Sequence, residues 1–131
     1  MHNRTGALGA AMLALAVLTG AFGSHGLQKL TTDPTVLEPY KTAVQYLCWH
    51  GLAILILWAA GDRLTERGRK VVVTFFMAGI ILFCGSLFFL TLAKIYQLSY
   101  TGIVFLTPIG GSLFVGGWLY LAYLLIAKQR N

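Results

Sequence analysis

Two histidines in apolar surroundings, His25 and His50, offer the chemistry that would be easiest to recognise in this sequence. A pair of imidazoles is a ligand set for a metal ion or a haem. Their depths in a membrane oppose a shared ion. His25 ends the first apolar run, whereas His50 lies about eight residues into the second, roughly 12 Å deeper at about 1.5 Å per residue. We therefore expect no metal and no cofactor.

A second interpretation makes His50 part of a polar pocket. Tyr46 and His50 are four residues apart, so both lie on one face of a helix. An ionisable side chain inside a membrane is a functional hypothesis by default. The pocket would open at the outer surface, with His50 as its floor, Tyr46 and Ser86 as its lining, and His25 and residues 28–41 as its roof. The alternative is that the histidines only make hydrogen bonds between helices.

Other catalytic constellations do not match the sequence, and we expect no catalytic residue. All acidic residues, Asp33, Glu38, Asp62 and Glu66, lie in polar stretches. A serine–histidine–acid triad would therefore lack its third member, and no serine has the G-x-S-x-G pattern. A proton-coupled exporter would lack its embedded carboxylate. Gly110 and Gly111 are not followed by the lysine of a phosphate-binding loop.

These residues are positioned by apolar runs that dominate the chain. Its 131 residues are 57% hydrophobic and 11% charged, whereas soluble domains carry about 25% charged residues. A bilayer core of about 30 Å requires about 20 helical residues. The sequence predicts an all-α integral membrane four-helix bundle that forms a single domain over residues 1–131. The spans are expected at about 6–27, 42–61, 71–93 and 107–127.

The connections between the spans have their own signals. Pro34 and Pro39 predict that no continuous helix passes through residues 28–41. Residues 62–70 are predicted to be a tight charged loop. The fourth span is predicted to begin with Thr107 as its N-cap and Pro108 at its first helical position.

Glycines recur in the spans at helical spacings. Small residues let membrane helices approach closely, which is how such helices pack without a hydrophobic driving force. We expect the first, third and fourth spans to pack through small faces, with these glycines in the contacts: Gly20, Gly23, Gly85, Gly110, Gly111 and Gly117.

The basic residues predict the orientation of the chain. The net charge of +6 is located at the ends of the apolar runs, which is typical of orientation signals and lipid contacts and does not indicate nucleic acid. One side of the membrane would hold three basic residues, Lys29, Lys41 and Lys94. The other would hold seven: Arg4, Arg63, Arg67, Arg69, Lys70, Lys128 and Arg130. The positive-inside rule places both termini in the cytoplasm.

Four motifs carry a resemblance to a known family. Residues 20–27, GAFGSHGL, are similar to a GAFGAHGL signature, and 42–53, with TAVQY and HGLA, to TAVxYQxxHALA. Residues 82–87, LFCGSL, are similar to LFSGSL, and 107–118 to TPIGG followed by GW. In this order the motifs resemble the YgdD/YwdK-like family of small membrane proteins, a domain of unknown function.

The resemblance implies a multi-pass protein of the bacterial cytoplasmic (inner) membrane and no established reaction. We expect a non-enzymatic protein that either affects membrane properties or is an accessory subunit of a larger membrane complex. Its partners would be the lipid bilayer and a homo-oligomer or larger complex, without nucleic acid. The alternatives are a transporter of small molecules or ions, or a cofactor- or lipid-binding protein that uses His50 and His25.

Overall fold

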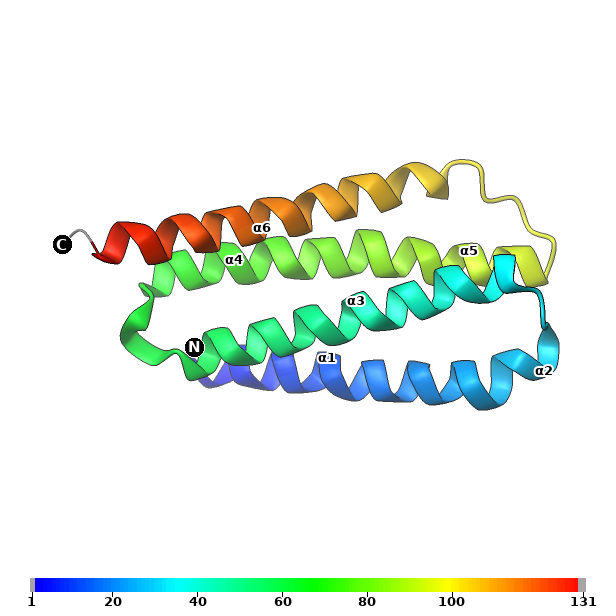
Figure 1. The fold of residues 1–131 in the computed structure, drawn as a ribbon, viewed down its shortest axis with the longest axis horizontal. Coiled ribbons are helices and arrows are strands. Elements are labelled where there is room, and N and C mark those ends of the chain that lie inside the picture. Colours follow the sequence, from blue (N-terminus) through cyan, green and yellow to red (C-terminus); the bar gives the residue numbers. More distant parts are fainter. Residues whose placement is uncertain (1, 130–131) are drawn as a thin grey trace.

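The computed structural model describes residues 2–129 and shows long helices that lie side by side (Figure 1). Over this range it contains four helical segments long and apolar enough to cross a membrane, which confirms the predicted all-α membrane architecture. The first segment comprises α1 (His2–Phe22), a π-helical turn η1 (Gly23–Leu27) and α2 (Gln28–Leu30). The second is α3 (Pro34–Ala59). The third comprises α4 (Glu66–Gly79), the π-helical η3 (Ile80–Cys84) and α5 (Gly85–Ile95), and the fourth is α6 (Leu106–Gln129). Short 3₁₀ turns, η2 (Gly61–Arg63) and η4 (Ile103–Phe105), precede α4 and α6.

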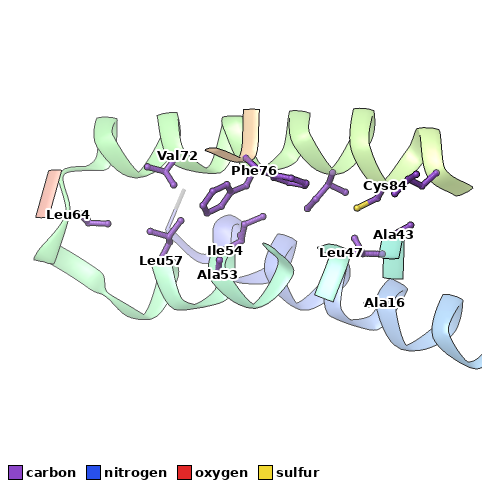
Figure 2. Close-up of a cluster of buried hydrophobic side chains, with 13 residues drawn as sticks. Ala16, Ala43, Leu47, Ala53, Ile54, Leu57, Leu64, Val72, Phe76 and Cys84 are labelled. Carbon is purple, nitrogen blue, oxygen red and sulfur yellow. The ribbon is translucent and has the colours of Figure 1, made fainter. Parts of the chain in front are cut away.

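The segments pack in a definite order. α1 packs on α3, α3 packs on α5 and η3, and α6 packs on α4 and η3. The start of α1 and the end of α6 lie at the same end of the bundle (Figure 1). α1 therefore forms one edge of the molecule, attached mainly to α3. The core lies between α3 and the third segment, and Figure 2 shows its side chains, among them Leu47, Ile54, Phe76 and Cys84.

The second span begins earlier than predicted, because one of the two prolines does not interrupt it. Asp33 caps α3 by accepting a hydrogen bond of 2.9 Å from the Thr35 N–H, and Pro34 follows in the first turn. Pro39 lies inside the helix and has no N–H for the Thr35 carbonyl, four residues earlier. The Lys94 ammonium donates to that carbonyl at 3.1 Å. Residues 31–33 are not helical, so no continuous helix passes through 28–41, as predicted, but Pro39 takes no part in the break.

The third span also begins earlier, inside the predicted charged loop. The Thr65 side chain accepts from the Gly68 N–H at 3.1 Å and caps α4. Glu66 and Lys70 then form an ion pair at 3.4 Å on the first turns of the helix. Arg69 is buried and donates to the Gly61 and Leu64 carbonyls, which ties the connection to the helix.

The fourth span begins at Leu106, after η4, so Pro108 occupies the third helical position and not the first. Proline is tolerated there because the first-turn N–H groups have no acceptor within the helix. The Thr107 hydroxyl is hydrogen-bonded to the Ser86 hydroxyl at 2.6 Å, so it links two helices.

Five of the six predicted packing glycines contact a neighbouring helical segment, and the sixth, Gly85, does not. A Cβ at Gly117 would lie 2.7 Å from the Phe76 ring, and one at Gly23 would lie 2.6 Å from the Tyr40 ring. Gly110 directly faces the backbone of Phe83, while Gly20 and Gly111 have looser contacts with Val44 and the Phe83 ring.

Gly85 is a correction, because it is exposed and a Cβ there would meet nothing within 4 Å. The prediction assumed a regular helix through the third span, but η3 comes directly before Gly85, and a π turn rotates the residues after it relative to an unbroken α-helix. Gly79 packs instead, because a Cβ at this position would lie 2.5 Å from the Phe114 ring.

Candidate functional site

His50 lies at the centre of an aromatic cluster between α3 and α6. Its side chain is 3% exposed. The Trp118 indole N–H, which can only donate, donates to His50 Nε2 at 3.1 Å. Nδ1 therefore carries the proton and donates to the Tyr46 carbonyl at 2.8 Å. Both ring nitrogens are used in hydrogen bonds, and one of these bonds joins two helices.

Stacked rings surround the imidazole. The Phe114 ring is stacked on it, with centroids 3.6 Å apart, and the Phe76 ring meets it edge-on at 5.1 Å. Tyr46 extends the cluster to Phe83, with centroids 4.6 Å apart. α3 and α6 thus meet through large aromatic side chains, while their backbones stay apart. The arrangement positions His50 rigidly.

Two hollows flank the bond between Trp118 and His50. One has a volume of about 670 Å³, and its lining includes Tyr46, Phe83 and Ser112. The other, of about 390 Å³, is lined by aliphatic side chains such as Leu121. Both hollows include Trp49, His50 and Trp118, and their surfaces are mainly apolar. The site can accommodate apolar chains or rings along the seam between α3 and α6.

The structure brings together Tyr46 and His50 but places the other two predicted site residues elsewhere. Ser86 is buried and donates to the Phe83 carbonyl at 2.9 Å, and its hydroxyl also meets Thr107. His25 is exposed on η1 and does not line the hollows at His50. Sequence reasoning missed the role of Trp118, although the residue stands in one of the motifs that carry the family resemblance.

Both π-helical turns overlap such motifs. η1 forms the second part of the 20–27 motif, and η3 overlaps the 82–87 motif. π turns occur frequently at functional sites, because the extra residue alters backbone bonding and side-chain direction. Within residues 2–129 no three side chains of the His, Cys, Asp and Glu types gather as a metal site would require.

Comparison with known proteins identifies the family. The family model described as "Protein of unknown function (DUF423)" matches residues 19–111. The chain belongs to the DUF423 family. A UPF0382 membrane protein of Staphylococcus aureus is 41% identical over 114 residues, which cover 87% of this chain and 88% of the relative. The UPF0382 membrane protein YwdK of Bacillus subtilis is 37% identical over 115 residues, covering 87% and 89%.

A more distant DUF423 relative is a UPF0382 membrane protein of Haemophilus influenzae, 35% identical over 107 residues that cover 82% of this chain and 81% of the relative. No solved structure matches the chain. The comparisons confirm the resemblance read from the four motifs. With the four long apolar helices, they show that this DUF423 member is a multi-pass membrane protein.

Proposed function

We propose that the protein is a non-enzymatic accessory subunit that packs against a larger membrane protein through the outward face of α1. The observation that carries the proposal is a contrast between the two helices at the edges of the molecule. Between Ala7 and Ala14 the outward face of α1 is made of small side chains, whereas the outward face of α6 is bulky. The two faces suit different neighbours.

The small face of α1 consists of exposed alanines, namely Ala7, Ala10, Ala11 and Ala14. The exposed side chains of α6 include Ile109, Val115, Leu119, Tyr123 and Ile126. Membrane helices associate by close backbone approach at small residues, so the alanine face suits a neighbouring helix. Bulky aliphatic and aromatic side chains suit lipid.

The internal polar groups support a packing role. His50 is held by Tyr46 and Trp118, and Thr91 donates to the Leu87 carbonyl at 3.1 Å. The buried Ser86 hydroxyl shares a hydrogen bond of 2.6 Å with the Thr107 hydroxyl of α6. The bonds of His50 and Ser86 join neighbouring helices, as expected of a scaffold.

Charge favours a different protein over a second copy as the partner. Copies inserted in the same orientation would pair their α1 helices in parallel, which brings the two Arg4 side chains and the two basic ends together. Arg4 is exposed, and Arg63, Arg67 and Lys70 are exposed at the same end of the bundle. Like charges at short range oppose such a dimer. A partner that is acidic at this membrane surface avoids the repulsion.

Site-directed photo-crosslinking in native membranes tests the proposal. A photoreactive residue at Ala11 should form a defined heterologous adduct, while one at Val115, exposed on α6, should crosslink mainly to lipid. Ala10→Leu and Ala14→Leu should abolish the adduct and the stoichiometric co-purification of that partner, and Val115→Leu should preserve both. A partner retained equally by all three variants, or an adduct only between copies of this chain, would refute the proposal.

A further inference from the structure

A further hollow, separate from the two at His50, lies between the first segment and α3, at the end of the first segment opposite its alanine face, and has a volume of about 270 Å³. Its inner part is apolar, with Leu27, which is fully buried, and Val44. Its rim is polar and comes from both helices: Ser24, Gln28, Lys41 and Gln45. Segments 20–27 and 42–46, which belong to two of the family motifs, both contribute to it.

Glycines and one tyrosine shape this hollow. Gly20 and Gly23 face α3 without side chains, and a Cβ at Gly20 would lie 3.5 Å from Val44. The Tyr40 hydroxyl donates to the Thr19 carbonyl, so the ring is held between the two helices as a wall. The π turn η1 then directs Ser24 to the rim. The hollow is thus a built-in feature of the interface between the first segment and α3.

The hollow lies where the exposed surface changes from polar to apolar. Along one exposed stripe of α3, Glu38, Lys41 and Gln45 are followed by Cys48 and Leu52. On the first segment, the exposed surface changes similarly, from Gln28 in α2 and Ser24 in η1 to Leu18 and Val17 in α1. This change marks the boundary between headgroups and hydrocarbon. A ligand in the hollow therefore has a polar part at the rim and an apolar part below it.

Donors at the rim are available to a ligand. The side chains of Ser24, Gln28 and Gln45 make no hydrogen bond to any other residue in the described range 2–129. Lys41 pairs with Glu38 at 3.1 Å, but both side chains are more than half exposed. Such an exposed pair contributes little and exchanges readily. The rim offers an ammonium group, two amides and a hydroxyl.

We propose that this hollow binds the phosphate and glycerol region of a phospholipid. The Lys41 ammonium meets the phosphate, and the Gln28 and Gln45 amides and the Ser24 hydroxyl donate to phosphate and ester oxygens. One acyl chain descends along Val44. The hollow has a polar rim and an apolar inner part, which favours a lipid over a free phosphate ester, because only a lipid occupies both. The site lies away from the alanine face of α1 and does not depend on the accessory role.

The test measures lipid retention by the purified full-length protein in detergent, using native mass spectrometry with dioleoylphosphatidylglycerol. Lys41→Met should lower the affinity roughly tenfold or more, as expected for loss of a charge-assisted contact. Gln45→Leu should lower it to a smaller degree. Lys29→Met is the matched control, because Lys29 is an exposed lysine at the same end that does not line the hollow. Thermal unfolding of each variant confirms that it is folded.

Two further measurements distinguish a phospholipid from a lipid without phosphate and from a soluble phosphate ester. Dioleoylglycerol, which lacks the phosphate, should be retained at least tenfold more weakly than the phospholipid, and glycerol 3-phosphate in solution should not displace the phospholipid. Equal loss in Lys29→Met and Lys41→Met would overturn the site. Equal retention of dioleoylglycerol, or displacement by glycerol 3-phosphate, would overturn the phospholipid assignment.

Discussion

The Lys94 ammonium lies 3.1 Å from the Thr35 carbonyl oxygen, the acceptor that Pro39 leaves without its usual helical N–H. A side chain from the third segment thus replaces a backbone bond of the second. The replacement lets α3 continue through an internal proline and fixes the ends of α3 and α5 to each other.

The first prediction concerns this bond. Lys94→Met should lower the free energy of unfolding by about 1 kcal/mol, the usual net value of one hydrogen bond. In a Pro39→Ala background, residue 39 regains an N–H for Thr35, so Lys94→Met should cost less there. A double-mutant cycle by thermal unfolding in detergent measures the difference. Identical costs in both backgrounds would show that Lys94 does not compensate for the proline.

The second prediction concerns His50 and Trp118. Trp118→Phe should destabilise the protein by about 1–3 kcal/mol, because His50 Nε2 is left buried without its donor. His50→Gln should be milder, since an amide can accept from the indole N–H. If His50 instead serves a ligand or proton pathway, the His50→Gln variant would stay folded but would fail to complement a strain that lacks the gene. His25→Gln, at an exposed position, is the control.

The third prediction compares two glycines in different surroundings. Gly117→Leu should cost about 1–3 kcal/mol or prevent folding, because its Cβ would lie 2.7 Å from the Phe76 ring. Gly85→Leu should be tolerated, because nothing lies within 4 Å of a Cβ there. Thermal stability in detergent distinguishes the two. A Gly85→Leu variant as unstable as Gly117→Leu would mean that this surface of α5 is packed.

The fourth prediction concerns pH and the cap of α3. Hydrogen bonds from the Thr35 N–H and hydroxyl hold the pKa of Asp33 below its usual value. Because the folded-state pKa is depressed, the stabilisation is present above the unfolded-state pKa and is lost as the pH falls through the folded-state pKa. Asp33→Asn should preserve the cap and flatten this acid-range loss. Melting temperatures measured from neutral to acidic pH for both proteins test the prediction.

The fifth prediction is the orientation, with both termini in the cytoplasm. In a background in which Cys48 and Cys84 are replaced by alanine, Thr32→Cys should react with a membrane-impermeant maleimide in intact cells. Arg63→Cys, exposed in η2 after the opposite end of α3, should react only after the cells are permeabilised. The excess of basic residues on the Arg63 side is the physical reason. The reverse labelling pattern would show that both termini lie outside the cytoplasm.

The membrane class, the four spans and the pairing of Tyr46 with His50 on one helix face were all predictable from the sequence. Hydropathy and helical spacing are local properties, since a run of about 20 apolar residues must cross a bilayer as a helix whatever surrounds it. The tertiary structure decided what depends on distant residues. α3 continues through Pro39 because the Thr35 carbonyl accepts a hydrogen bond from Lys94, which lies 59 positions further along the chain. Trp118 likewise donates to His50 across 68 positions. Gly85 turns away from the packing face because the π turn before it changes the helical phase, which no fixed repeat along the chain reveals.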